Sequence, residues 1–407
     1  LVMRRFFMKK SKIRRQTSKN IPEPSPSKGV RWKETLFRLW QADEWNIPLA
    51  LWVGSRLAIF LIPLLLRGLI PSQESQSIVD IYMRWDAGWY AEIAKHGYQW
   101  AVPETQPSVA FFPLYPLIVR LVSFLFGGNV PLAMFVVSNL AFLVYLHHLY
   151  LLARYDFDAS TAERTALYVA AFCLSFFFSV GYTEALFLAL ATSAFYYARK
   201  GRWSLAIPLG MLSCLTRLAG VAVTFPLAWE WYKQKGLSPK ALVLTLVPLG
   251  LGIFMVYLGH LTGDPFAFNT IQKAWNHRLT WPWGTFFIAW QVVRSLPLTR
   301  YITAIAWIDF GTMVIFLVLM LAMIPRTPPS YWLYSVPVYF ISTSATLDPT
   351  AGLPTASIAR YLMSIFPVFI FLGYLGKNRW VHYIVLFTFL VLLGPLLLYF
   401  LAGIWVE

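Results

Sequence analysis

Apolar residues gather in long runs along this chain, and short polar or charged stretches separate these runs. A run of about 17–25 residues is long enough for a helix to cross the hydrocarbon core of a bilayer. Helices are favoured there because a backbone surrounded by lipid must satisfy its own hydrogen bonds. The pattern predicts about eleven transmembrane helices, at residues 47–66, 130–152, 164–180, 182–198, 203–217, 219–232, 240–262, 301–324, 331–346, 360–376 and 380–402.

Charges between the runs predict how these helices are oriented. Lysine and arginine are enriched in cytoplasmic loops, and this rule assigns to that side Arg154, Arg164, Arg199, Lys200, Arg202, Lys233, Lys235, Lys240, Arg326, Lys377 and Arg379. The assignment requires residues 67–129 to lie wholly on the outer side, so their apolar part, 109–126, is expected to rest at the interface. The sequence predicts two large outer loops with short amphipathic helices, 67–129 and 263–300, and a small one near 347–359.

The composition identifies the class of protein that this pattern describes. Hydrophobic residues make up 58% of the chain and charged residues only 13%, whereas soluble domains carry about 25% charged residues. These values exclude a soluble domain, a disordered chain and a collagen-like fibre. Both cysteines, Cys173 and Cys214, lie in apolar runs, so no disulfide framework is expected. We expect an all-α, multi-pass integral membrane protein.

The net charge of +16 is concentrated near the N-terminus. Residues 1–38 hold twelve Lys or Arg and two Asp or Glu, which gives +10 and leaves +6 for the rest. A stretch this rich in Pro, Ser and Lys buries too little apolar surface to fold alone. We expect residues 1–40 to be a largely disordered cytoplasmic tail that contacts lipid headgroups rather than nucleic acid, and residues 41–407 to be one transmembrane domain.

One carboxylate in the first outer loop lies among aromatic residues. Asp86 follows Trp85 and precedes Trp89 and Tyr90. Apolar surroundings change the pKa of a carboxylate and are typical of catalytic acids and bases. Aromatic faces also bind sugar rings. The alternative is an interfacial aromatic belt in which Asp86 caps a short helix.

Three arginines lie on the outer side, against the usual distribution of positive charge. They are Arg120, Arg217 and Arg360. A phosphate-bearing ligand would account for them, because a guanidinium group matches phosphate oxygens. The alternatives are structural ion pairs, with Glu184 as one partner, and an Arg120 side chain that reaches toward lipid headgroups.

Other chemistry finds little support in the sequence. No nucleotide-binding fingerprint, catalytic serine or cysteine signature, or internal repeat is present. His96 and His277 are possible bases or ligands, but the six histidines show no metal-binding spacing. We therefore expect no metal and no cofactor. The second outer loop, from Phe266 to Trp290, is expected to be an amphipathic helix on the bilayer surface.

Seven short motifs occur in a recognisable order: Arg-Trp-Asp-x-x-Trp-Tyr (84–90), Ile-Ala-x-x-Gly-Tyr (93–98), Phe-Phe-Pro-Leu-Tyr-Pro (111–116), Tyr-Thr-Glu (182–184), Thr-Arg (216–217), Gly-Asp-Pro (263–265) and Arg-Tyr (360–361). From about residue 45 onward the chain resembles the PIG-V-type mannosyltransferases (the GPI mannosyltransferase 2 family), which are multispanning GT-C glycosyltransferases. The chain departs from the family at Ala359, where Gly is usual, and at Ala219, where Pro or Asn is frequent.

The resemblance implies an inverting transfer of a sugar, typically mannose, from a polyprenyl or dolichyl monophosphate donor. The acceptor is a lipid-linked molecule or glycan on the extracytoplasmic face, a GPI precursor in eukaryotes. The membrane is the plasma membrane in a prokaryote and the endoplasmic reticulum in a eukaryote. In this reading Asp86 is the base, the arginines hold the phosphate, and substrate contacts come from Arg84, Trp85, Trp89, Tyr90, His96, Tyr115, Tyr182, Glu184 and Tyr361.

Two other functions remain open, namely a lipid or sugar transporter (flippase) and a non-catalytic membrane subunit. A transporter is expected to carry charges at the bilayer midplane and to show repeat symmetry. Here the charged motifs gather on one side, and a scaffold has no need of the first-loop motif. The enzyme is the favoured function.

Overall fold

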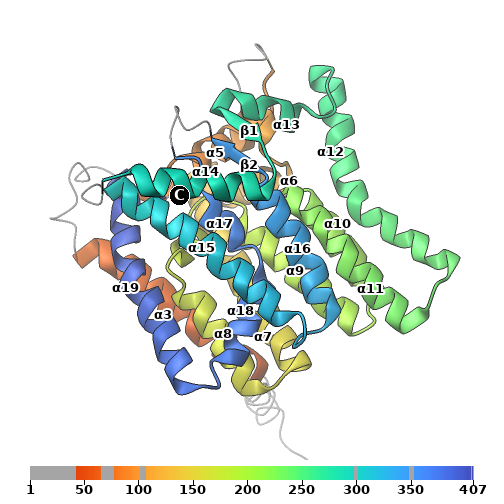
Figure 1. The fold of residues 1–407 in the computed structure, drawn as a ribbon. Coiled ribbons are helices and arrows are strands. Elements are labelled where there is room, and N and C mark those ends of the chain that lie inside the picture. Colours follow the sequence, from red (N-terminus) through yellow and green to blue (C-terminus); the bar gives the residue numbers. More distant parts are fainter. Residues whose placement is uncertain are drawn as a thin grey trace, which may run out of the picture. The chain divides into compact units, whose positions relative to one another are not determined.

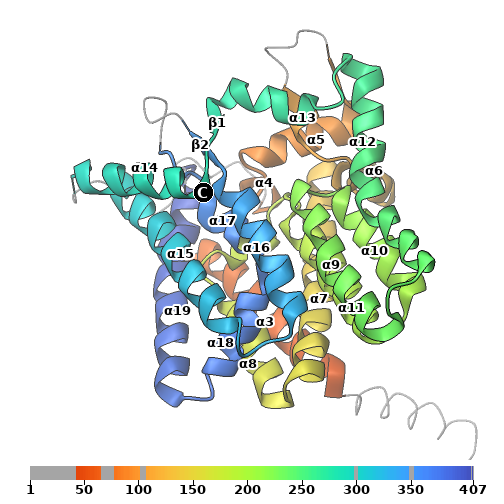
Figure 2. The ribbon, with the colours of Figure 1, turned by 45° about the vertical axis from the view of Figure 1, so that its right-hand side comes forward.

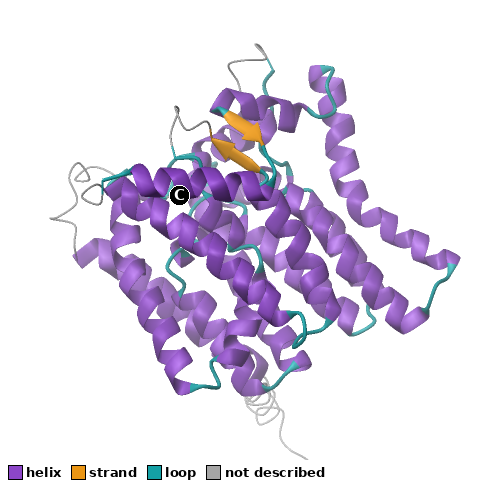
Figure 3. Cartoon of the chain, viewed as in Figure 1, coloured by secondary structure: helices purple, strands orange, loops and turns teal. Residues whose placement is uncertain are grey.

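The computed structural model describes residues 43–65, 78–100, 107–297, 301–347, 353–404 and 406. The predicted tail, residues 1–40, lies outside them. Residues 47–407 form one compact unit, and the described residues before it, 43–46, are the first turn of a helix. That unit is a bundle of helices with two short strands at one end (Figures 1 and 3).

The first half of the chain contains α3 (Asp43–Leu65), α4 (Ile78–Ile81), α5 (Asp86–His96), η2 (Pro107–Ala110), α6 (Leu114–Ser123), η3 (Phe124–Phe126), α7 (Val130–Asp156), α8 (Ala159–Ala171), η4 (Ser175–Phe178), α9 (Glu184–Arg199) and α10 (Trp203–Cys214). The second half contains η5 (Leu218–Val223), α11 (Thr224–Lys235), η6 (Pro239–Thr245), α12 (Leu246–Thr262), α13 (Ala267–Thr270), η7 (Ile271–Trp275), β1 (His277–Leu279), α14 (Pro282–Ser295), α15 (Tyr301–Met323), α16 (Pro329–Thr343), β2 (Ala345–Leu347), α17 (Ile358–Leu362), α18 (Phe366–Leu375) and α19 (Arg379–Leu401).

Side-chain caps explain where several of these helices begin. Asn129 precedes α7 and accepts a hydrogen bond from the Leu132 backbone N–H (3.0 Å). Asp158 does the same for α8 through the Thr161 N–H (2.7 Å). Asn and Asp are favoured at this position because their oxygens satisfy a backbone donor that lacks a helical partner.

By length and composition, five helices in the described ranges are able to cross a membrane: Glu44–Ile62, Val130–Asp156, Pro239–Thr262, Tyr301–Met323 and Arg379–Leu401. Every apolar run predicted to span contains helix in the structure, but several of these helices are short. The number of about eleven spans therefore stays a prediction. The stretch 109–126 contains the end of η2, then α6 and η3, and these helices are too short to cross.

Buried aromatic rings and one glycine contact hold the bundle together. Phe142 on α7 stacks on Phe178, with ring centroids 4.5 Å apart. The buried Arg56 of α3 lies over the Phe142 ring and donates to Ser179 Oγ at 2.6 Å. A Cβ atom at Gly373 would lie 2.2 Å from Thr165 Oγ1, so only glycine lets α18 pack this closely on α8.

The second outer loop differs from the single amphipathic helix predicted for it. It contains α13, η7, the strand β1 and then α14. The strand β1 pairs antiparallel with β2, and His277 lies opposite Leu347. This pair joins segments far apart in sequence, so local periodicity carries no sign of it. The all-α prediction is wrong at these two strands. Figures 1 and 2 both show them at one end of the bundle, beside α14.

Candidate active site

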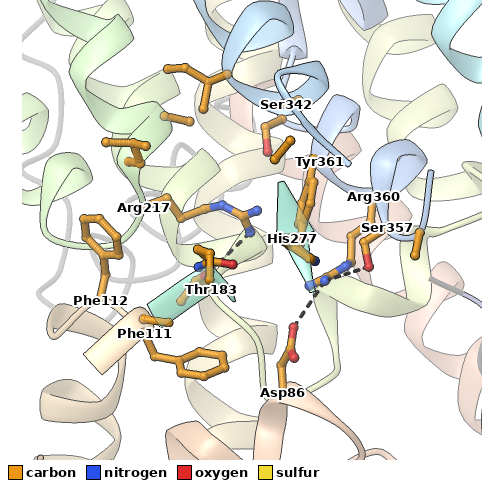
Figure 4. A pocket seen from close by; sticks show the side chains of 18 of the residues that line it. Asp86, Phe111, Phe112, Thr183, Arg217, His277, Ser342, Ser357, Arg360 and Tyr361 are labelled. Carbon is orange, nitrogen blue, oxygen red and sulfur yellow. Dashed lines mark hydrogen bonds and ion pairs between the residues drawn. The ribbon is translucent and has the colours of Figure 1, made fainter. Parts of the chain in front are cut away.

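A pocket of about 500 Å³ opens at the end of the bundle where these strands lie. The first outer loop contributes the start of α5, and the second contributes β1. The remaining walls come from the residues before α9 and η5, the end of α16, and α17. Segments that are separate in the sequence therefore meet around one cavity (Figure 4).

Backbone strain is concentrated at this pocket. Among the described residues other than glycine, positive φ angles occur at Trp85 (55°), Asn276 (58°) and Ser357 (68°). Trp85 and Ser357 line the pocket, and Asn276 immediately precedes the lining residue His277. Such conformations are costly for residues with a Cβ and cluster at functional sites. Their position supports a binding or catalytic role for the cavity.

The charged groups of the site form one continuous network. Glu184 is fully buried, and its Oε1 atom lies 2.5 Å from Arg217 Nη1 and 3.0 Å from Arg360 Nη1. Arg360 also reaches Asp86, with Nη2 3.2 Å from Oδ2. Figure 4 shows Asp86 and Arg360 pointing toward each other, with Arg217 entering from another wall. Ion pairing with Glu184, the alternative considered for these arginines, does occur.

Two hydroxyl groups and the rings of two tyrosines also contact the arginines. Arg217 Nη1 donates to Thr183 Oγ1 (3.3 Å), and Arg360 Nη2 donates to Ser357 Oγ (3.2 Å). The Arg360 guanidinium carbon lies 5.0 Å from the ring centre of Tyr182 and 4.9 Å from that of Tyr361. Arg217 lies 5.5 Å from the same Tyr361 ring. The aromatic faces stabilise these cations and keep both guanidinium planes in place.

Aromatic contacts hold α5, and therefore Asp86, in position. Tyr90 packs edge-on against Phe111 and Tyr115, with ring centroids 5.0 and 5.3 Å apart. Trp89 stacks on Phe111 at 6.1 Å. The Phe-Phe-Pro-Leu-Tyr-Pro motif therefore supports the helix that begins at Asp86.

Two glycines allow the charged residues to approach one another. A Cβ at Gly181 would lie 2.4 Å from Met134 Cε and 3.2 Å from Ala87 Cβ, so glycine lets the segment before Glu184 lie against α5. A Cβ at Gly220 would lie 2.4 Å from the Ser213 carbonyl oxygen. Glycine there lets η5 fold back onto α10, which places Arg217 at the cavity.

His277 belongs to the site through β1; the sequence suggested it, with His96, only as a possible base or ligand and did not place it with the other site residues. Burial lowers the pKa of His277, and the negative charge of Asp86 opposes this effect only in part. Its imidazole is therefore neutral at pH 7 and able to accept or share a proton. A lone histidine in a loop gave no distinctive sequence signal. Only the pairing of β1 with β2 brings it to the pocket.

The structure gathers most of the predicted site residues. Those that line the pocket are Trp85, Asp86, Trp89, Tyr90, Arg217, Arg360 and Tyr361. Glu184 and Tyr182 lie buried next to them, in contact with the Arg360 side chain. Pocket residues that the sequence did not single out as site residues include Thr183, Gln272, Ser342 and Ser357.

Two predicted contacts have structural roles beside the pocket instead. Arg84 turns away from it and donates to the Leu401 carbonyl at the end of α19 (3.0 Å). Tyr115 is buried, and its hydroxyl lies 2.8 Å from Ser138 Oγ.

Two further predicted contacts lie on the surface. His96 is exposed at the end of α5, 3.7 Å from Glu92. Arg120 is exposed on α6 and does not line the pocket. Of the three arginines predicted to hold a phosphate, only Arg217 and Arg360 are brought together.

Part of the chain that forms this site is similar in sequence to a known protein family. Residues 55–230 match the model of the mannosyltransferase (PIG-V) family, which confirms the resemblance predicted from the motifs over this part of the chain. The matched part carries Asp86, Glu184 and Arg217. Together with the apolar helices, the match supports a membrane glycosyltransferase. No curated protein matches the chain significantly.

Among solved structures, the chain is similar to ArnT from Cupriavidus metallidurans bound to undecaprenyl phosphate, with 13% identity and a TM-score of 0.49. That similarity covers 81% of this chain and 60% of ArnT. The oligosaccharyltransferase AglB from Archaeoglobus fulgidus, in complex with an inhibitory peptide and a dolichol-phosphate, matches with 14% identity and a TM-score of 0.40. It covers 88% of this chain and 55% of AglB. The chain therefore spans less than two thirds of either protein.

Proposed function

We propose that this protein is an inverting mannosyltransferase whose donor is a polyprenyl- or dolichyl-phosphate sugar. The acceptor is a hydroxyl group of a lipid-linked molecule or glycan on the extracytoplasmic side. One observation carries the proposal: a single pocket holds a carboxylate, Asp86, in contact with one of two arginines, Arg360 and Arg217. A direct displacement at the anomeric carbon needs a base for the attacking hydroxyl and positive charge for the departing phosphate.

Asp86 is the proposed base. Its side chain is 30% exposed, in contrast to the fully buried Glu184. A carboxylate at the pocket wall is accessible to an acceptor hydroxyl, whereas a carboxylate beneath the wall is not. The neighbouring Trp85 and Trp89 offer apolar faces against which a sugar ring packs. In the transfer, the acceptor O–H proton moves to Asp86 while the acceptor oxygen bonds to the anomeric carbon, whose bond to the phosphate oxygen breaks.

The charge balance of the network suits this reaction. Asp86 and Glu184 formally neutralise Arg217 and Arg360. A donor phosphodiester brings one negative charge, and the departing phosphate monoester carries about two. When Asp86 takes the proton it loses its own negative charge, and at that moment Arg360 loses a partner. The uncompensated positive charge of Arg360 is then available to the phosphate, so the total charge of the site stays constant through the step.

Glu184 holds the two arginines together. Because it is buried between them, its negative charge offsets the repulsion between these two cations, and it does not exchange a proton with the substrate. The phosphate would bind where both guanidinium groups face the cavity, with Tyr361 between them. The proposed step therefore needs only side chains of this protein.

The chain segments that line the pocket support the proposed extracytoplasmic location of the active site. The start of α5 lies in the predicted outer loop 67–129, and β1 lies in the predicted outer loop 263–300. Pro354, Ala356 and Ser357, from the third predicted outer loop, also line the pocket. All three loops that the charge distribution assigns to the outer side meet at this cavity.

A transfer assay tests the proposal directly. The full-length protein in lipid nanodiscs is supplied with a polyprenyl-phosphate mannose or with GDP-mannose, together with candidate hydroxyl acceptors. We expect product from the lipid-linked donor only, with the anomeric configuration opposite to that of the donor, as measured by mass spectrometry and NMR. Retained configuration, or transfer from the nucleotide sugar alone, contradicts the proposal.

A further inference from the structure

A second pocket of about 540 Å³ lies where α3, α8 and the turn between α18 and α19 meet. The proposed transfer reaction does not use it. Its lining combines three cations, Arg164, Lys377 and Arg379, and one carboxylate, Glu163, with apolar side chains that include Leu51 and Leu167. A cavity that combines an excess of cations with apolar groups suits the two parts of an anionic lipid, its charged headgroup and its acyl chains.

This pocket is separated from the candidate active site by the length of α19. That helix begins at Arg379, beside the second pocket, and ends at Leu401. The Leu401 carbonyl accepts the hydrogen bond from Arg84, two residues before Asp86. At about 1.5 Å per residue the helix is about 35 Å long, close to the thickness of a bilayer core. Figure 1 shows its first turn at the end of the bundle opposite the strands. The two pockets therefore lie at opposite ends of the bundle.

Arg164 is a fixed positive charge in this pocket. Its side chain donates to three neutral acceptors: the Gly373 carbonyl (2.8 Å), Ser160 Oγ (2.7 Å) and Thr161 Oγ1 (3.2 Å). No carboxylate in the described ranges pairs with it. Because these acceptors are neutral, they fix the orientation of the guanidinium group without compensating its positive charge. That charge therefore remains available to an anion.

The turn beside Arg164 is packed tightly. A Cβ at Gly376 would lie 2.2 Å from the Tyr168 hydroxyl oxygen and 3.1 Å from Arg164 Cδ, so glycine allows this close approach. The same Tyr168 hydroxyl lies 2.9 Å from His382 Nδ1, which fixes the ring of another residue that lines the pocket. The floor of the pocket is therefore ordered before any ligand binds.

The other two cations of the pocket, Lys377 and Arg379, are exposed to solvent and able to contact a ligand. Lys377 lies 3.0 Å from Asp158 Oδ2, but this ion pair is about half exposed. An exposed pair of this kind contributes little stability, so an anionic ligand is able to share the lysine. Arg379 is exposed at the first turn of α19.

The apolar side of the pocket leads onto helices that face lipid. Both α3 and α19 carry segments able to cross a membrane. Beyond the pocket, Leu57 and Leu61 on α3 and Ile384 and Phe387 on α19 are exposed. Free phosphate would need only the cations, whereas an acyl chain also uses these surfaces.

We propose that this second pocket binds the phosphate headgroup of an anionic phospholipid, with its acyl chains along α3 and α19. The bias of cytoplasmic loops toward Lys and Arg accounts for exposed cations in general. It does not require one of them to be held by three hydrogen bonds at the floor of a cavity. The proposal is independent of the transfer reaction at the other end of the bundle.

Native mass spectrometry of the full-length protein tests this site. The protein is titrated with phosphatidylglycerol, with phosphatidylcholine of the same acyl chains, and with inorganic phosphate. We expect preferential binding of phosphatidylglycerol. The double variant Lys377→Gln/Arg379→Gln should weaken that binding about tenfold and leave phosphatidylcholine binding unchanged, because each cation near the surface contributes to the attraction.

The matched control is Lys200→Gln/Arg202→Gln. It removes two exposed cations just beyond the end of α9, outside the pocket. Because all four side chains are exposed, both double variants should keep the wild-type thermal unfolding temperature. We expect the control to bind phosphatidylglycerol like the wild type. An equal loss in both variants, equal binding of the two lipids, or binding of inorganic phosphate without lipid preference would overturn the proposal.

Discussion

Arg360 and Asp86 form an ion pair, with Nη2 and Oδ2 3.2 Å apart, although 274 positions separate them in the chain. The proposed base and a proposed phosphate-binding cation are therefore in contact before any substrate arrives. A substitution at either residue is expected to change the electrostatics of the other. The following predictions use this coupling to separate catalysis from binding.

The first prediction concerns Asp86. The Asp86→Asn variant keeps the size of the side chain but removes its basicity, so turnover should fall by about 10²- to 10⁴-fold. Donor affinity should stay the same or increase, because Arg360 no longer has Asp86 as a competing partner. Single-turnover rates and equilibrium donor binding measure the two effects separately.

The control for Asp86 is on the same helix. Glu92→Gln removes an exposed carboxylate of α5 that lies outside the pocket, so transfer should remain near the wild-type rate. Normal transfer by Asp86→Asn, or an equal loss in Glu92→Gln, would remove Asp86 from the role of base.

The second prediction concerns the phosphate. Arg217→Lys keeps the charge and one contact to Glu184 but loses the planar fork of the guanidinium group. The dissociation constant of the donor should rise about tenfold, or about 1.4 kcal/mol. Turnover should fall as well, because the same oxygens are held in the transition state.

Arg120→Lys is the matched control for this variant, because Arg120 is exposed on α6 and does not line the pocket. It should leave donor affinity unchanged. If Arg217 only pairs with Glu184, its variant will lose thermal stability while the folded fraction binds donor normally. That result would leave the phosphate site without support.

The third prediction concerns pH. Burial lowers the pKa of His277 below its ordinary value of about 6.5. The folded protein therefore favours the neutral ring, and the stability linked to it is complete above pH 6.5 and is lost as the pH falls through the folded pKa. Activity should decline over the same range, because a protonated His277 beside Asp86 competes with Arg360 and the acceptor. The charged or ionisable groups that also line this pocket are Asp86, Tyr90, Arg217, Arg360 and Tyr361.

His277→Gln should remove this acidic limb from the pH–rate profile while leaving any limb due to Asp86 in place. The exposed His96 offers the comparison, since His96→Gln should reproduce the wild-type profile. An unchanged profile in His277→Gln would show that another group titrates.

The fourth prediction concerns orientation in the membrane. A cysteine at Glu92 should react with a membrane-impermeant reagent only from the outer side, and a cysteine at Lys200 only from the cytoplasmic side. Both side chains are exposed, whereas the native Cys173 and Cys214 are buried and should stay unlabelled. The neighbouring Gly201 is unsuitable because its φ of +68° disfavours any other residue. Labelling of position 92 from the cytoplasm would reverse the proposed orientation.

Sequence reasoning found the components of the site but not all of its geometry. Asp86, Arg217 and Arg360 stood out because charged residues are rare beside apolar runs. The sequence also suggested Glu184 as a partner for the arginines. It did not show that Arg360 contacts Glu184 and Asp86 at once, since this depends on how α17 packs against α5 and α9. His277 was beyond prediction as a pocket residue because its position depends on a strand pair between distant segments.

The rule that places Lys and Arg in cytoplasmic loops did not predict the environment of Arg199. This residue was assigned to the cytoplasmic surface, but its side chain is buried at the end of α9. It lies 2.5 Å from Glu230 and 3.1 Å from Asp156. The rule considers only the number of cations in a loop and takes no account of carboxylate partners on other helices, here Asp156 on α7 and Glu230 on α11. Its assignment of the loop itself is untouched, because Lys200 is exposed next to it.

The spread of the pocket along the chain has a consequence for how the protein is made. Asp86 and Glu184 emerge from the ribosome long before Arg360, which lies on α17 near the end of the sequence. Until α17 is inserted, the nascent chain lacks both the partner of Asp86 and one of the two cations beside Glu184. Contacts this distant in sequence form late in folding. A chain that ends before α17 therefore has an incomplete pocket: Glu184 keeps Arg217 as its partner, but Asp86 has lost Arg360, and one of the two proposed phosphate-binding cations is missing.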